Sequence, residues 1–248
     1  MKAKPGDHVA IIGGGIIGAM CGWHLLDAGC RVTVVDRKTF GAACSHGNCG
    51  YVSPSHVLPL CQPGAIIKTM KSMLSSNSPF RVQPRMSMDF FNWFWSFAWR
   101  CNKRDMLAAA EGRHALLQSS KQEYQRIIAE NHILCEWRES GLLFVFDHTQ
   151  EFESFGKTDQ LLRQHFGVGA TPYAGDELVE LEPAIKPGFG GGWHYEGDCH
   201  LRPDKLMSQL KEKLLERGAQ LIEDFSVDHF ACEASVAKSI LAGTESVE

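Results

Sequence analysis

A glycine-rich turn between an apolar strand and a helix constrains the fold of this chain more than any other feature. Residues 8–12 form an apolar run that is typical of a buried strand. Gly13, Gly15 and Gly18 follow at the G-x-G-x-x-G spacing, and residues 19–28 carry apolar side chains three and four positions apart, as in a helix. This order of elements predicts the start of a Rossmann-like βαβ unit.

The turn also predicts a ligand. Gly13 permits the sharp turn off the strand, Gly15 has no Cβ to block a pyrophosphate, and Gly18 lets the helix pack closely on the sheet. The helix start leaves unpaired N–H groups and a partial positive charge, which stabilise a diphosphate. A second apolar strand, 31–35, ends in Asp36, where an acid accepts hydrogen bonds from ribose hydroxyls. We therefore expect a dinucleotide site, the alternative being an ordinary βαβ unit with glycines in its turn.

Composition excludes several classes of function. The chain has 248 residues with 25 Lys and Arg against 29 Asp and Glu, so a broad nucleic-acid surface is not expected. Its nine cysteines include no C-x-x-C pair, which disfavours a metal site and fits reduced thiols in the cytoplasm. We find neither a signal-peptide pattern nor an apolar stretch of membrane-spanning length. At most, peripheral contact with a membrane is expected.

A loop rich in small residues follows the second strand, and by composition alone it is an ordinary surface loop. Together with the turn and Asp36, however, its residues resemble the FAD-dependent D-amino acid oxidoreductase superfamily, and within it the small subunit of bacterial D-amino acid dehydrogenase. The resemblance extends almost from end to end. It rests on Ser45-x-x-Asn48-x-Gly50, Val52-Ser53-Pro54, Gly141–Phe144, Leu181–Ala184, Gly190–Trp193 and Gly197–His200.

This resemblance implies an α/β fold, in which an α+β substrate domain is inserted into a Rossmann-like FAD-binding domain. We place the first part of the FAD domain at residues 1–85, the substrate domain at 86–199 and the second, incomplete part of the FAD domain at 200–248. Relative to the family, the chain is expected to be truncated at its C-terminus. The residues expected to bind FAD are Gly13, Gly14, Gly15, Ile16, Ile17, Gly18, Asp36, Arg37, Ser45 and Asn48.

The activity implied by the resemblance is oxidative deamination of D-amino acids to 2-oxo acids and ammonia. Electrons would pass to a quinone of the respiratory chain or to another acceptor, which allows a location at the cytoplasmic face of the inner membrane. Tyr51 and His56 are substrate candidates, and no catalytic acid or base is nominated. His46 and Cys49 depart from the residues usual in the family; either could be joined covalently to flavin, but we expect an unmodified loop.

Alternatives remain open at this level. A related enzyme could oxidise glycine, sarcosine, D-proline or hydroxyproline, with oxygen in place of quinone. The same turn and acid would also serve a nicotinamide-dependent dehydrogenase. A third alternative is an inactive fragment or subunit that needs a partner chain, because an FAD domain without its remaining strands would expose an unpaired sheet edge.

Helices are expected at 63–74, 105–130, 151–166, 177–181 and 203–217, and strands at 141–146, 187–195, 219–222 and 225–230. A mild interruption of the long helix is expected at residues 111–114. The region around residues 90–100 is unusual, with seven Phe and Trp side chains followed by Arg100. Such a helix is either a buried core element, the interpretation we favour, or a membrane-interface element backed by Arg100, Lys103 and Arg104.

Overall fold

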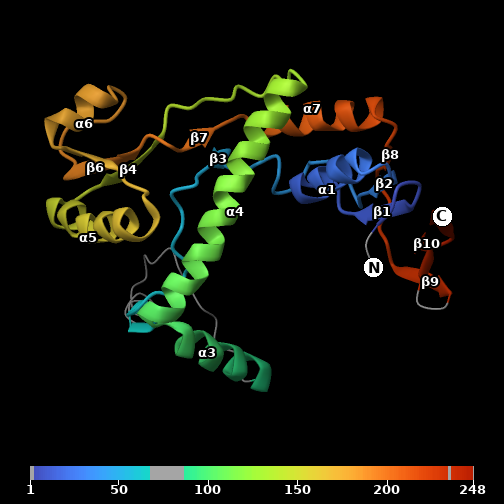
Figure 1. Ribbon diagram of the computed structural model, residues 1–248, viewed down its shortest axis with the longest axis horizontal. Helices are drawn as coiled ribbons and strands as arrows, with labels where there is room; N and C mark the ends of the chain where they lie inside the picture. Colours follow the sequence, from blue (N-terminus) through green and yellow to red (C-terminus); the bar gives the residue numbers. More distant parts are fainter. Residues whose placement is uncertain (1–2, 68–86, 234–235, 248) are drawn as a thin grey trace. The chain divides into compact units, whose positions relative to one another are not determined.

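The computed structural model describes residues 3–67, 87–233 and 236–247 (Figure 1). The chain forms two compact units. The first consists of Met1–Tyr51, Ile127–Arg138 and His200–Glu248, and the second of Val52–Arg126 and Glu139–Cys199.

These units divide the chain differently from the predicted domains. The first unit ends at Tyr51 rather than at residue 85, and it also contains residues 127–138. The loop after Tyr51 belongs to the second unit because Ser55 hydrogen-bonds the buried Asp198. The chain passes between the units at β3 (Tyr51–Val52), after Arg126, after Arg138 and at β7 (Cys199–His200).

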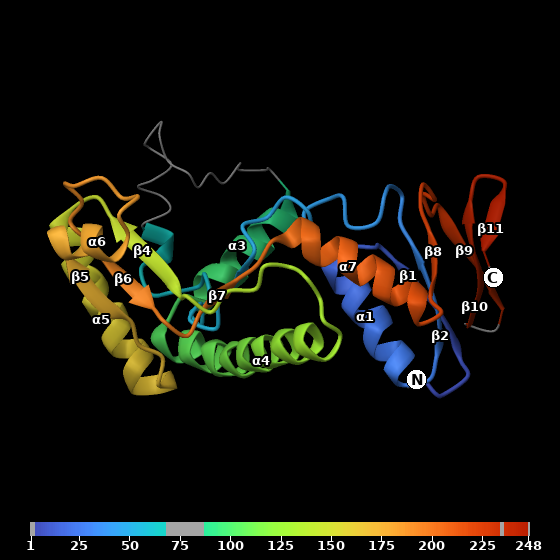
Figure 2. The same ribbon diagram turned by 90° about the horizontal axis from the view of Figure 1, so that it is seen from above.

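A parallel sheet forms the centre of the first unit. Its order is β1 (His8–Ile12), β2 (Arg31–Val35) and β8 (Gln220–Ile222). Two helices, α1 (Ile16–Asp27) and α7 (Pro203–Glu216), pack against each other beside this sheet (Figure 2). The predicted βαβ unit is therefore present, and its third parallel strand comes from a segment nearly two hundred residues later.

The two neighbouring strands of the βαβ unit differ in burial. In β2, the four residues after Arg31 are all buried, as expected for a strand covered on both faces. In β1, exposed and half-buried residues alternate, and Ile12 is 50% exposed. Among the described residues, β1 pairs only with β2, so it lies at an edge of the sheet.

A small antiparallel sheet completes the first unit. It is formed by β9 (His229–Glu233), β10 (Val236–Ala242) and β11 (Glu245–Val247). The strand predicted at 225–230 begins only at His229. Phe225 is instead a buried residue of the connection, and its amide donates to the carbonyl of Asp36.

The second unit contains a three-stranded antiparallel sheet with β6 (Gly191–Tyr195) between β4 (Leu142–Phe146) and β5 (Thr171–Ala174). Two helices, α5 (Thr149–Phe166) and α6 (Asp176–Leu181), complete this part of the unit. The ring of Trp193 is anchored where its Nε1 donates to the carbonyl of Phe152 at 3.0 Å. Gly167 ends α5 with a φ of +66°, as its position after the helix predicted.

Two consecutive helices, α3 (Met88–Arg100) and α4 (Lys103–Glu130), correct two expectations. The prediction that α3 is a core element is wrong, because none of its residues is buried. The predicted interruption of the long helix is also absent, since α4 is continuous through residues 111–114. Its buried side includes Met106 and Ala110, whereas Leu116 is 73% exposed.

Part of the helix predicted at 63–74 lies outside the described residues; residues 65–67 are helical. Within the described ranges, no helix is both long enough and apolar enough to cross a bilayer.

Candidate cofactor site

The candidate site lies where the parallel strands of the first unit end and α1 begins. β1 and β2 run in register from His8 beside Arg31 to Ile12 beside Val35, so their carboxyl ends meet at one edge. There the amide of Gly14 donates to Oδ2 of Asp36 at 2.7 Å. The turn and the acid, which are 22 residues apart in sequence, are therefore in direct contact.

Each glycine of the turn meets a different steric demand. Gly13 has a φ of +107°, which L side chains rarely adopt. A Cβ on Gly14 would lie 2.6 Å from the ring of Phe40, and a Cβ on Gly18 would lie 1.9 Å from the carbonyl oxygen of Gly13. The start of α1 therefore lies in close contact with the turn that precedes it. The first amides of the helix lie at the carboxyl ends of β1 and β2.

Apart from the amide of Ile16, the amides at the start of α1 are available to an anion. Gly15 is the N-cap residue and has no side chain to accept from them, and the first turn contains no acidic residue. Ser45 accepts one bond, from the amide of Ile16 to its Oγ at 2.9 Å. Ile17, in the same turn, is 77% exposed. A diphosphate at this position would meet main-chain donors and the positive end of the helix dipole.

Asp36 retains acceptor capacity beyond its contact with the turn. Oδ2 accepts from Gly14, and Oδ1 accepts from the amide of Lys38 at 2.9 Å. Each carboxylate oxygen can accept two hydrogen bonds, so a further acceptor position remains on each. Arg37 is exposed beside it. The donor set and the glycines therefore fit the adenosine diphosphate part of a dinucleotide.

The loop that supplies Ser45 is organised by Asn48. Its Nδ2 donates to the carbonyls of Cys44 and Ser45, both at 3.1 Å, and its Oδ1 accepts from the amide of Gly50 at 2.7 Å. Because both of its donor hydrogens have partners in the loop, Asn48 acts here by positioning Ser45. His46 and Cys49, the two departures from the family pattern, are exposed.

The sequence interpretation missed a group of residues that support the turn. The buried Phe40 ring lies over Gly14, and its amide donates to Oε1 of Glu223 at 2.7 Å. Lys211 on α7 also bonds this carboxylate, at 2.6 Å. The Lys211 hydrogen bond, with that from Phe40, lowers the pKa of Glu223. An isolated apolar residue at position 40 was the one signal available, since Glu223 is 183 residues away in sequence.

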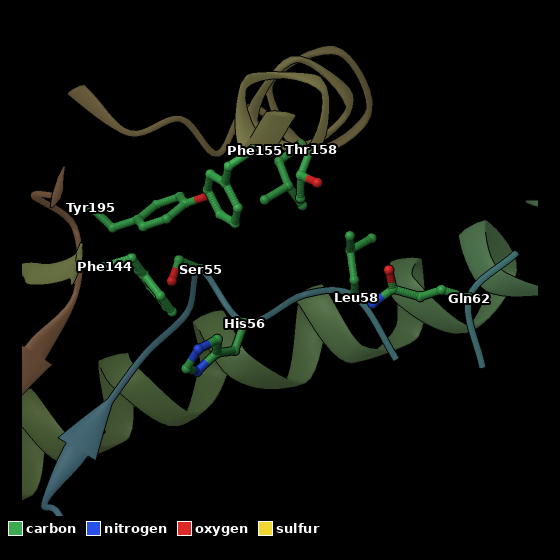
Figure 3. Close-up of a pocket in the computed structure, with 9 residues that line it drawn as sticks. Ser55, His56, Leu58, Gln62, Phe144, Phe155, Thr158 and Tyr195 are labelled. Atoms are coloured by element: carbon green, nitrogen blue, oxygen red, sulfur yellow. The ribbon is translucent and has the colours of Figure 1, made fainter. Parts of the chain in front are cut away.

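The second unit has a pocket of its own, with a cavity of about 170 Å³ (Figure 3). Its walls are mostly aromatic and aliphatic, with a few polar groups. They are Ser55, His56, Leu58, Gln62, Phe144, Phe155, Thr158, Leu162 and Tyr195. Burial, together with the nearby Asp159 and Asp198, raises the pKa of Tyr195, which keeps its hydroxyl neutral. Of the two substrate candidates, His56 lines this pocket, whereas Tyr51 is 53% exposed in the first unit.

A buried carboxyl fixes the pocket loop. Asp198 is 1% exposed and accepts from the amide of Ser55 at 3.0 Å and from its hydroxyl at 2.6 Å. Burial raises the pKa of Asp198, and the two bonds from Ser55 oppose that shift. Sequence reasoning did not find this pair, although Asp198 stands in the Gly197–His200 motif. In the part of the chain that the structure describes, no three His, Cys, Asp or Glu side chains are grouped to hold a metal ion.

The chain is similar to known proteins in sequence and in fold. A D-amino acid dehydrogenase of Neisseria meningitidis serogroup C is 29% identical over 213 residues, covering 83% of this chain and 51% of the relative. A D-amino acid dehydrogenase of Chromohalobacter salexigens is 34% identical over 222 residues, with 84% and 51% covered. The crystal structure of glycine oxidase from Bacillus cereus ATCC 14579 superposes with a TM-score of 0.63 at 16% identity, covering 97% of this chain and 52% of that one.

The chain thus spans about half the length of the curated relatives it matches. The family profile described as "DAO: FAD dependent oxidoreductase" matches residues 8–247, nearly the whole chain. By this match, the chain belongs to the DAO family of FAD-dependent oxidoreductases.

Proposed function

We propose that this protein takes part in the FAD-dependent oxidation of D-amino acids to 2-oxo acids and ammonia. The substrate class comes from the relatives named D-amino acid dehydrogenase, which match more than four fifths of the chain. The observation that carries the proposal is the contact between the glycine turn and Asp36 at the head of α1, since a dinucleotide needs main-chain donors and an acid at this place.

The cofactor proposal assigns roles to the residues of this edge. Gly13–Gly18 bring their main chain against the diphosphate, and Asp36, with Arg37 beside it, holds the adenosine ribose. Ser45 borders the diphosphate from the loop, and Asn48 positions Ser45. When bound, FAD supplies the two-electron acceptor for the substrate, and the protein supplies binding and orientation.

The pocket of the second unit is our candidate for the apolar part of an amino acid. Aromatic walls in a cavity of about 170 Å³ suit a small apolar side chain. His56 borders the cavity, and its ring makes an edge contact with Phe144 at 5.4 Å. Tyr51 is kept as a substrate candidate from the first unit. Neither residue is proposed as a catalytic acid or base.

For the electron acceptor we propose a quinone, with the protein at the cytoplasmic face of the inner membrane. The name dehydrogenase, carried by both curated relatives, favours an acceptor other than oxygen. Reoxidation rates of the reduced protein with a water-soluble quinone and with oxygen test this choice. A faster reaction with oxygen would contradict it.

The function is tested by loading the full chain with FAD and adding D-alanine, L-alanine or glycine without oxygen. We expect D-alanine to bleach the flavin absorbance, with release of ammonia, and L-alanine to leave it unchanged. The His56→Ala variant should slow the bleaching, whereas His229→Ala, which replaces an exposed histidine of β9, serves as the matched control. Bound flavin that no D-amino acid reduces would contradict the proposal.

Oxidation of glycine or a related small amine is the second candidate, favoured by the fold likeness to glycine oxidase. In the same experiment, this candidate predicts bleaching by glycine and slower bleaching by D-alanine. A nicotinamide-dependent enzyme would instead bind no flavin and would oxidise its substrate only when NAD or NADP is added.

A further inference from the structure

The outward side of α3 is a continuous apolar stripe formed by Met88, Phe91, Trp95 and Trp99. Spacings of three, four and four residues place these side chains on one side of the helix. Their exposed fractions are 74%, 50%, 70% and 75%. Single exposed apolar residues are common on proteins, but three large aromatic rings and a methionine in one stripe indicate an interaction surface.

The stripe carries most of the exposed apolar side chains of α3. On the other side of the helix, Phe90, Phe94 and Phe97 are half-buried and Trp93 is 55% exposed. The rings of Phe90 and Phe94 stack with centroids 6.3 Å apart. The helix start is fixed by Ser87, whose Oγ accepts from the amide of Phe90 at 3.2 Å. The stripe is thus presented by a formed and capped helix.

Size and composition of the helix suit the boundary between water and lipid. Thirteen residues span roughly 20 Å, too short for the hydrocarbon core of about 30 Å, so α3 would lie in the plane of the membrane. Trp side chains prefer the headgroup level, where an apolar ring and a polar N–H are both accommodated. Asn92 and Ser96 lie beside the stripe on α3, where they would contact the lipid headgroups.

The charge around the stripe differs in sign from the chain as a whole. The chain carries a formal net charge of -4, whereas residues 87–105 contain three Lys and Arg against two acids, Asp89 and Asp105. Lys103 and Arg104 directly follow the stripe and are exposed, and the exposed Arg100 has its Nε 3.9 Å from Oδ2 of Asp105. A basic border beside exposed aromatic rings is complementary to a surface of anionic phospholipids.

We propose that α3 binds the surface of an anionic phospholipid bilayer. The stripe enters the boundary between headgroups and acyl chains, and Arg100, Lys103 and Arg104 contact lipid phosphates. This inference extends the proposed location at the inner membrane, but it does not depend on the proposed reaction, because it is argued from the exposure and charge of one helix.

The test is cosedimentation of the full chain with vesicles of phosphatidylglycerol and phosphatidylcholine, and with vesicles of phosphatidylcholine alone. We expect binding to the mixed vesicles, and about a hundredfold weaker partitioning into the neutral ones. Replacing both flanking charges (Lys103→Gln with Arg104→Gln) should weaken binding to mixed vesicles by about tenfold or more.

The triple variant Phe91→Gln, Trp95→Gln, Trp99→Gln should lose at least about a hundredfold of the partitioning, with an unchanged circular dichroism spectrum. Its matched control is Leu116→Gln, which removes an equally exposed apolar residue from α4 and should bind like the wild type.

Two results would overturn the proposal. One is absence of vesicle binding, including the case in which the stripe instead drives a concentration-dependent dimer that the triple variant abolishes. The other is equal binding by the triple variant and the wild type.

Discussion

Replacement of Gly18 by alanine tests how closely α1 approaches the glycine turn. The added Cβ would lie 1.9 Å from the carbonyl oxygen of Gly13, and its next contact, with the carbonyl carbon, would be at 3.1 Å. An ordinary contact begins near 3.4 Å, so the helix would have to move by about 1.5 Å. The obstacle is backbone, which cannot rotate away as the end of a flexible side chain can.

The expected cost of Gly18→Ala is about 3 kcal/mol, at the upper end of the usual range for overpacking. Gly22, one turn further along α1, is the matched control. A Cβ there would lie 3.5–3.6 Å from Ile11, Val32 and Val34, in ordinary contact. Gly22→Ala should therefore stabilise the protein by about 0.5–1 kcal/mol, because alanine is the better helix former.

Urea unfolding followed by circular dichroism measures both variants. With a slope of about 2–3 kcal/mol per molar, the midpoint of Gly18→Ala should fall by about 1 M and that of Gly22→Ala should rise slightly. Hydrogen exchange of the peptide that contains β1 and α1 assigns the change to the first unit. Equal midpoints for the two variants would refute the close approach of α1 to the turn.

Three further outcomes are expected. Ser55→Ala should lower the free energy of unfolding by about 1–3 kcal/mol, because it removes one of the two donors to the buried Asp198; an unchanged urea midpoint would contradict this. The pKa of Asp198 is raised in the folded state, so the stability that depends on this group is present at low pH and is lost as the pH rises above about 4. Asp198→Asn should accordingly gain stability relative to wild type between pH 4 and pH 7, as measured by urea midpoints across that range. If the midpoints of variant and wild type change with pH in the same way, Asp198 is not the source of the pH dependence. Gly167→Ala should cost about 1 kcal/mol at a φ of +66°, whereas Gly112→Ala, inside α4 with open space around its Cβ, should stabilise by a similar amount, and thermal unfolding can compare the two.

The sequence predicted well those parts of the fold that depend on residues close together in the chain. The strand, glycine turn and helix at residues 8–27 follow from apolar spacing and glycine positions within one short segment. The end of α5 follows from Gly167 in the same way. The family resemblance extended this local pattern to the cofactor, and the profile match confirms the family.

Other features depend on residues that are far apart, and no local pattern indicates them. The bond between Ser55 and Asp198 joins positions 143 residues apart, and that between Phe40 and Glu223 joins positions 183 apart. The aromatic helix α3 was expected in the core because its composition is that of a core. Composition does not determine whether another element covers a helix, and in this structure its outward side is exposed.

The most direct test of the cofactor site uses Gly15 and Ser45 together. A Cβ on Gly15 would lie 3.1 Å from Oγ of Ser45, so Gly15→Ala alone could act through either the cofactor or the serine. Titration of FAD should therefore be measured for wild type, Gly15→Ala, Ser45→Ala and the double variant. Because Cβ of alanine would stand between the diphosphate and the main chain, we predict at least about tenfold weaker FAD binding on adding Gly15→Ala to either background. If Ser45→Ala restores full affinity to Gly15→Ala, or if no variant alters FAD binding, the assignment of the diphosphate to this turn is contradicted.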